Sequence, residues 1–79
     1  MAAPSGPPRF LTLADVAEAL NTSSAQVYAL VRRGELPAIK LGGRGQWRVE
    51  SAVLEEFIQR LYADTRAFVA GHPFADQEA

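Results

Sequence analysis

Cysteine is absent from this 79-residue chain, which excludes a disulfide framework and a thiolate metal site and fits a reducing cytosol. No apolar run approaches the roughly 18 residues that a membrane-spanning helix needs. The opening MAAPSGPPRF lacks the basic and apolar regions of a signal peptide. We therefore expect one soluble, cytoplasmic domain. A chain of this length buries only about 60% of its unfolded surface, so its core should be thin.

Groups suited to catalysis or metal binding are also scarce. The single histidine, His72, lies in a predicted acidic tail. The glycine-rich GGRG lacks the Lys and Ser/Thr spacing of a phosphate-binding loop and lies between predicted strands instead of before a helix. The adjacent Glu55 and Glu56 cannot converge on one face of a helix. The sequence therefore predicts no enzyme, no cofactor and no metal site, and no small-molecule effector is evident.

The net charge is only −1, but the charges are segregated along the chain. Between residues 32 and 48, five basic residues stand against Glu35 alone, a net charge of +4. The rest of the chain holds three arginines and eight acidic residues, a net charge of −5. A basic region on an acidic body can bind a polyanion in one orientation. The five basic residues are Arg32, Arg33, Lys40, Arg44 and Arg48.

A first short helix is predicted over about 13–20. Thr12 is a suitable N-cap, and Asp15 at the third helical position resembles the acidic member of a capping box. From Leu13 onward, apolar residues recur at i, i+3, i+4 and i+7, which is one face of a helix. Asn21 should end it.

A second helix is predicted over 23–33, with Ser23 and Gln26 as a capping box and Gly34 as a left-handed C-cap. The connection NTSS is so short that the two helices must pack at an angle, the helix-turn-helix arrangement. The buried side of the second helix should consist of Val27, Leu30 and Val31. The outward residues should be Ser24, Gln26, Ala29, Arg32 and Arg33, with Tyr28 at the boundary. A face with small residues, an amide and two arginines can enter a groove and form hydrogen bonds there. The alternative is that these residues form an ordinary solvated face.

The segment LPAIKLGGRGQWRVE, residues 36–50, predicts a β-hairpin over 37–49 whose GGRG tip carries Arg44. Alternation in both strands should give an apolar face of Ile39, Leu41, Trp47 and Val49 that leans on the helices. A two-stranded ribbon is not stable alone in water, so its base must pack and its tip is left to project. We call residues 37–49 the wing. An arginine at its tip suits a phosphate or a narrow minor groove.

Two residues of the return strand have alternative interpretations. Trp47 either supports the hairpin from the core side or lies against the sugar–phosphate backbone of a nucleic acid. Arg48 either ties the wing to the second helix or contacts phosphate.

A third helix should begin at Ser51 and run to about Ala70, ending at Gly71. This is more than five turns at 3.6 residues per turn, whereas the core needs only about three. The surplus, residues 62–71, either folds back over the core or packs against a second copy or another protein, and we favour an intermolecular contact. Its expected contact residues are Leu61, Tyr62, Thr65, Phe68 and Val69. Residues 1–9 should form a disordered arm and residues 72–79 a flexible tail.

Three parts of the sequence together resemble a known family. They are LTLADVAEAL, the junction VYALVRRGELPA, and a basic wing ending in WRV before ESAVLEEFI. The sequence over 10–61 resembles the MerR-like, excisionase-type winged helix-turn-helix domains, also called helix-turn-helix domain 17. The expected fold is therefore mostly α with a small β-hairpin, in the order α-α-β-β-α with a long C-terminal helix. Relatives often place longer polar side chains at the positions of Ala25 and Ala29.

The resemblance implies binding of double-stranded DNA, with the second helix in the major groove and the wing against the adjacent backbone or minor groove. The expected role is a small transcription regulator or an excisionase-like factor, as a dimer or an array along nucleoid DNA. An architectural DNA binder of low specificity, or a protein-interaction adaptor acting through the third helix, are the alternatives. The expected DNA-contacting residues are Ser23, Ser24, Gln26, Tyr28, Arg32, Arg33, Lys40, Arg44, Gln46, Trp47 and Arg48.

Overall fold

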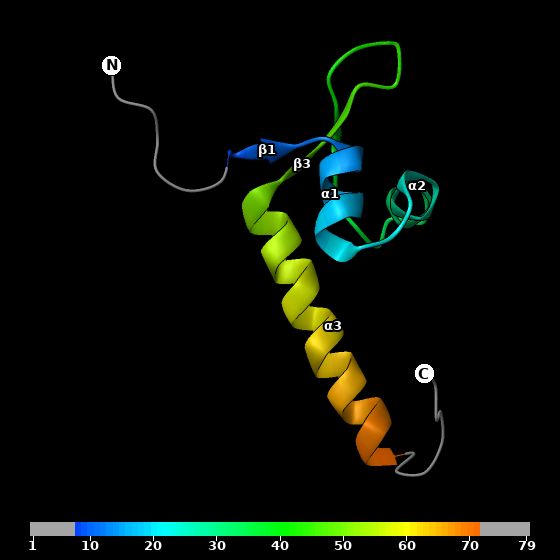
Figure 1. Cartoon of the computed structure of the whole chain (residues 1–79), viewed down its shortest axis with the longest axis vertical. Helices are drawn as coiled ribbons and strands as arrows, with labels where there is room; N and C mark the ends of the chain where they lie inside the picture. Colours follow the sequence, from blue (N-terminus) through cyan, green and yellow to red (C-terminus); the bar gives the residue numbers. More distant parts are fainter. Residues whose placement is uncertain (1–7, 72–79) are drawn as a thin grey trace, which may run out of the picture.

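The computed structural model describes residues 8–71, which form three helices and a small antiparallel sheet (Figure 1). The elements in chain order are β1 (Phe10–Leu11), α1 (Leu13–Leu20), α2 (Ser24–Arg32), β2 (Ile39–Lys40), β3 (Trp47–Glu50) and α3 (Ser51–Gly71). The predicted fold, a mostly helical winged helix-turn-helix with a long C-terminal helix, is confirmed. The predicted tail at 72–79 and most of the predicted arm at 1–9 lie outside the described residues.

The caps of α1 and α2 follow from their sequences. The Thr12 hydroxyl accepts a hydrogen bond from the Asp15 backbone N–H, and the Asp15 carboxylate accepts one from the Thr12 N–H, so α1 has a complete capping box. Asn21 ends α1 in the left-handed conformation at φ 56°, which asparagine tolerates better than most residues. The Ser23 hydroxyl accepts from the Gln26 N–H and starts α2, but the Gln26 side chain makes no return hydrogen bond within residues 8–71, so only half of the predicted capping box forms. Gly34, with φ +79°, follows its last turn.

The sheet contains one strand more than the sequence predicted. β3 lies in the centre, with β1 antiparallel on one side and β2 antiparallel on the other. β1 is anchored at its start, because the backbone N–H of Ser51 donates to the Arg9 carbonyl over 2.7 Å and the Ser51 hydroxyl donates to the Pro8 carbonyl. An ion pair of 3.0 Å joins Arg9 to Glu50. A two-residue strand is too short to show an alternating pattern, which is why the sequence did not reveal it.

The predicted apolar face of β2 is wrong. Lys40 is opposite Trp47, and Ile39 is opposite Arg48, so the core side of the wing carries Lys40 instead of Ile39. Ile39 and Leu41 are 47% and 56% exposed. The pairing with β3 places Lys40 on the side of Trp47 and of the buried Val49, and Leu36, ahead of the strand, is the fully buried apolar side chain of this segment.

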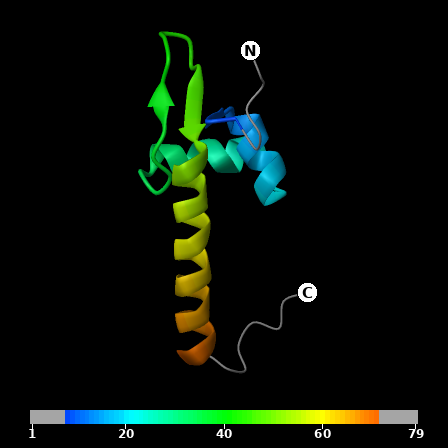
Figure 2. The same ribbon diagram turned by 90° about the vertical axis from the view of Figure 1, so that its left-hand side faces the viewer.

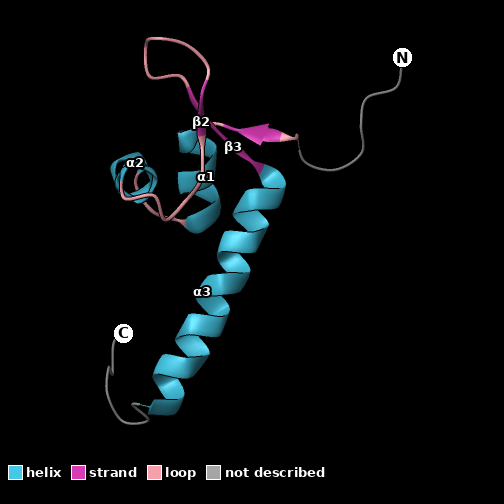
Figure 3. Cartoon of the chain, turned by 180° about the vertical axis from the view of Figure 1, so that it is seen from behind, coloured by secondary structure: helices cyan, strands magenta, loops and turns pink. Residues whose placement is uncertain are grey.

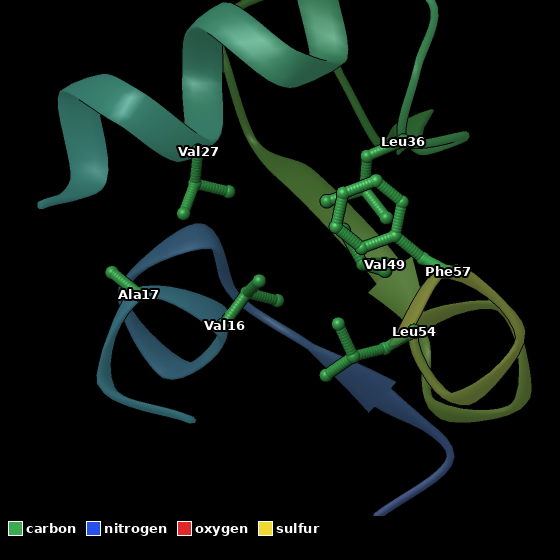
Figure 4. Close-up of a cluster of buried hydrophobic side chains, with 7 residues drawn as sticks. All are labelled: Val16, Ala17, Val27, Leu36, Val49, Leu54 and Phe57. Atoms are coloured by element: carbon green, nitrogen blue, oxygen red, sulfur yellow. The ribbon is translucent and has the colours of Figure 1, made fainter. Parts of the chain in front are cut away.

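Seven side chains from every helix, from β3 and from the loop before β2 form the core (Figure 4). Leu30 and Val31, predicted as buried residues of α2, pack at the edge of this cluster and are only half-buried. No polar or charged side chain is buried within residues 8–71. The core residues are Val16, Ala17, Val27, Leu36, Val49, Leu54 and Phe57.

Only the first two turns of α3 cover this core. The helix then continues away from the other elements, and the wing extends toward the opposite end of the molecule (Figures 2 and 3). Tyr62 is 61% exposed and Val69 is 55% exposed. The alternative in which residues 62–71 fold back over the core is therefore wrong. None of the helices in residues 8–71 has the length and apolar character to cross a bilayer.

Candidate nucleic-acid interface

The exposed side of α2 has two edges. At about 100° per residue, Ser24, Tyr28 and Arg32 follow each other at intervals of four and lie along one edge. Gln26 and Arg33 lie along the other edge, roughly 160° and 140° around the helix from Tyr28. All five side chains are exposed. Ala25 and Ala29 lie between the edges, so the middle of this face carries only methyl groups.

The wing lies against the edge that carries Tyr28. The Tyr28 and Trp47 rings meet edge to face, with centroids 6.3 Å apart and an interplanar angle of 67°. The ammonium group of Lys40 lies 5.8 Å from the centroid of the Trp47 ring, on the same side of the hairpin. Because edge-to-face aromatic pairs and cation–π contacts are attractive, this chain of three side chains adds to the core packing of Val49 in holding the base of the wing beside α2. We call Tyr28, Lys40 and Trp47 the aromatic junction.

Trp47 is half-buried and takes part in this junction, which agrees with its structural interpretation. Arg48 is on the opposite side of the strand, where its guanidinium donates to the Trp47 carbonyl over 2.8 Å. It does not reach α2 in any hydrogen bond or ion pair of residues 8–71, so the interpretation that it ties the wing to the second helix is not supported.

The tip of the wing is a tight loop. The Leu41 N–H donates to the Gln46 carbonyl over 2.8 Å, and the Trp47 N–H donates to the Gly45 carbonyl over 3.0 Å. Gly45 has φ +74°, a left-handed conformation that glycine adopts without a steric penalty. Arg44 and Gln46 are exposed on this loop, which extends beyond the strands (Figure 2).

The predicted basic residues differ in whether their charge is compensated. The guanidinium of Arg33 forms a 2.9 Å ion pair with Glu35. The hydrogen bond and charge of Glu35 raise the pKa of Arg33, and the same pair lowers the pKa of Glu35. Arg32 and Arg44 form no hydrogen bond or ion pair with any residue in 8–71, so their charges face solvent without a partner. The available positive charge is therefore concentrated on the edge of α2 beside the wing and at the wing tip.

Two residues outside the predicted set shape this surface. Glu35 neutralises Arg33, and Arg60 of α3 donates to the Glu35 carbonyl over 3.2 Å, which ties the turn after α2 to α3. In the sequence, Glu35 is the only acidic residue of the basic region. Its position two residues after Arg33 could have indicated this ion pair. Nothing in the sequence indicated the contact of Arg60.

The structure therefore distributes the predicted DNA-contacting residues over several parts of the surface. Ser24, Tyr28 and Arg32 adjoin Lys40 and Trp47, while Arg44 and Gln46 extend from them at the tip. Ser23 uses its hydroxyl to cap α2. Gln26 and Arg33 lie on the far edge of α2, and Arg48 lies on the outer side of the sheet. No cluster of three or more His, Cys, Asp or Glu that could hold a metal occurs in the described part of the chain.

A family model described as a helix-turn-helix domain matches residues 10–62. Two proteins from two strains of Mycobacterium tuberculosis, "Putative DNA-binding protein MT0521" and "Putative DNA-binding protein Rv0500A", are each 36% identical over 56 residues. The match covers 71% of this chain and 69% of each relative. No solved structure gives a significant match.

Proposed function

The chain belongs to the helix-turn-helix domain family, and on that premise we propose that it binds double-stranded DNA. In this proposal α2 enters the major groove, and the wing lies against the adjacent backbone or minor groove. The names of the two mycobacterial relatives support a DNA-binding role. The observation that carries the proposal is the aromatic junction, because it holds a basic wing beside the exposed edge of α2 as one surface.

In this proposal the residues take different parts, both on this surface and, for Gln26 and Arg33, on the far edge of α2. Arg32 and Arg44 contact phosphates, release condensed counterions and supply much of the affinity. Lys40 adds positive charge where the wing meets α2. Gln26, in the first turn of α2, is the candidate for hydrogen bonding an adenine edge. Arg33 contributes less than the sequence implies, since Glu35 already satisfies it.

The cellular role that we propose is a small cytoplasmic transcription regulator or an excisionase-like factor. A specific observation favours a second candidate, an architectural binder of nucleoid DNA with low sequence specificity. Ala25 and Ala29 occupy the centre of the α2 face, and their methyl groups offer no hydrogen bond to distinguish base pairs. The ratio of specific to non-specific affinity at physiological salt separates the two roles.

The test is the salt dependence of duplex binding. We expect Arg32→Ala and Arg44→Ala each to weaken binding to a duplex of mixed sequence and to reduce the slope of log K against log salt by about 1, because each removes one phosphate contact. Arg66→Ala is the matched control, since it removes the same charge from near the C-terminal end of α3, and that end of the helix lies at the other end of the molecule from the wing (Figure 1).

The comparison among these three variants decides the proposal. If Arg32→Ala and Arg44→Ala bind with the affinity and salt slope of Arg66→Ala, the surface does not contact DNA. Far-ultraviolet circular dichroism would establish that all three variants are folded, which is expected because the three side chains are exposed.

A further inference from the structure

The face of the sheet that points away from the core carries exposed apolar side chains. Strand pairing places Ile39 opposite Arg48 and Phe10 opposite Glu50. Because side chains alternate along a strand and paired residues share a face, these four side chains lie on the face opposite the buried Val49. Phe10 and Ile39 are 40% and 47% exposed. Exposed apolar side chains that gather on one face indicate a contact with another molecule.

A groove of about 230 Å³ on this face brings these side chains together. Apolar side chains from three elements line it, namely Phe10 of β1, Ile39 of β2 and Val53 of α3, and Arg48 of β3 lies among them. Pockets that enclose a small molecule usually have volumes of about 300–1,000 Å³. This smaller groove therefore suits a few side chains of a larger partner. We call it the outer groove.

The charge of the outer groove is positive and incompletely compensated. Glu50 is already paired with Arg9 at 3.0 Å. The guanidinium of Arg48 is half-buried and donates one hydrogen bond, to the Trp47 carbonyl, and it forms no ion pair with a carboxylate of residues 8–71. A guanidinium has five N–H donors and binds carboxylates through charge-assisted hydrogen bonds, which are stronger where solvent is partly excluded. The group that complements this groove is therefore a carboxylate beside apolar side chains.

We propose that the outer groove binds a short segment of another protein in which apolar side chains flank an acidic residue. The carboxylate of that residue pairs with Arg48, and the apolar side chains cover Phe10 and Ile39. A DNA backbone fits this groove less well, because its phosphates would meet hydrocarbon and the carboxylate of Glu50. The groove lies on the face of the sheet opposite Trp47, since side chains alternate along β3. The inference is therefore independent of the proposed DNA surface.

The test uses a phage-displayed library of random dodecapeptides, selected on the full chain and counter-selected on Ile39→Asp. We expect the enriched peptides to combine apolar residues with Asp or Glu. Fluorescence polarisation of an enriched, labelled peptide should show about tenfold weaker binding to Arg48→Gln, which loses a charge-assisted pair but keeps a donor for the Trp47 carbonyl. Arg48→Lys is the matched control, because it retains the charge, and it should bind more tightly than Arg48→Gln.

A second pair of variants separates recognition of the carboxylate from damage to the strand. Ile39→Asp and Ile39→Lys both replace an exposed apolar side chain with a charged one, so a structural effect would be equal in the two. We expect Ile39→Lys to bind the acidic peptide at least about tenfold more tightly than Ile39→Asp, because only the aspartate repels it. Circular dichroism would establish that both variants are folded.

Four results would overturn the proposal. The first is no enrichment over Ile39→Asp, which would follow if residues 1–7 or a second copy filled the groove. The second is enrichment of peptides without acidic residues, and the third is equal affinity of Arg48→Gln and Arg48→Lys. The fourth is a slope of log K against log salt for duplex DNA that is lower by about 1 in Arg48→Gln than in Arg66→Ala, which would assign Arg48 to a phosphate instead.

Discussion

The aromatic junction predicts an energetic coupling between α2 and the wing, which a double-mutant cycle can measure. The two changes are Tyr28→Leu and Trp47→Leu, made singly and together. Leucine retains an apolar side chain at each site, so we expect all the variants, including the double variant, to stay folded. Lys40 is present in all four proteins of the cycle, so its cation–π contact with Trp47 cancels from the coupling term.

The magnitude follows from the geometry. Edge-to-face pairs with centroids between about 4.5 and 7 Å contribute about 0.5–1.5 kcal/mol beyond the area that they bury, and the observed separation of 6.3 Å is in the outer part of that range. We therefore expect a coupling of about 0.5–1 kcal/mol. For a domain of this size, 1 kcal/mol corresponds to a shift of about 4–8 °C in Tm.

The assay is urea unfolding followed by circular dichroism at 222 nm, since fluorescence would lose its only tryptophan in two of the four proteins. Tyr28→Phe is the control, because it retains the ring and should keep the coupling while removing only the hydroxyl. Additivity between distant, independent sites holds within about 0.3–0.5 kcal/mol. A cycle that closes to within about 0.3 kcal/mol of zero would show that Tyr28 and Trp47 are not coupled, and that core packing and strand pairing hold the wing beside α2 without the aromatic junction.

Two further predictions concern the core and the charge of the surface. Leu36→Ala should lower the free energy of unfolding by about 2–5 kcal/mol, because it empties a fully buried site. That loss is close to the whole stability of a small domain, so circular dichroism should show a largely unfolded chain. Leu36→Met is the control and should lower the free energy of unfolding by less than about 1.5 kcal/mol. Glu35→Gln should raise the affinity for duplex DNA and steepen its salt dependence, because it releases Arg33 and removes the only acidic residue of the basic region. An affinity equal to that of the unmodified chain at low salt would place Arg33 outside the DNA surface.

The helices could be predicted closely from the sequence because their signals are local. The cap at Thr12, the left-handed residue at Asn21 and the cap at Ser23 act on backbone groups within three or four positions, so short motifs identify them. The bounds of α1 are those predicted. The long α3 was also evident, since apolar periodicity over 21 residues is a strong signal.

The register of the wing could not be predicted in the same way. Ile39 and Leu41 alternate with Ala38 and Lys40, and that pattern alone favours burial of the larger pair. The structure buries neither, because the pairing with β3 places Lys40 opposite Trp47, and the fully buried side chain of this segment is Leu36. A shift of one position exchanges every side chain between the two faces of a strand. The register depends on contacts between residues far apart in the chain, and a local sequence pattern carries no information about those contacts.

The candidate surface has a consequence for any mutational study of this protein. Tyr28 and Trp47 serve both as packing and as parts of the proposed DNA surface, so their removal would weaken binding even if neither touches DNA. Arg33 and Arg48 are engaged in intramolecular contacts, and their removal would combine two effects in the same way. Arg32 and Arg44 form no hydrogen bond or ion pair within residues 8–71, and neither is part of the core. Loss of affinity in these two variants would therefore report contact with DNA, with stability unchanged.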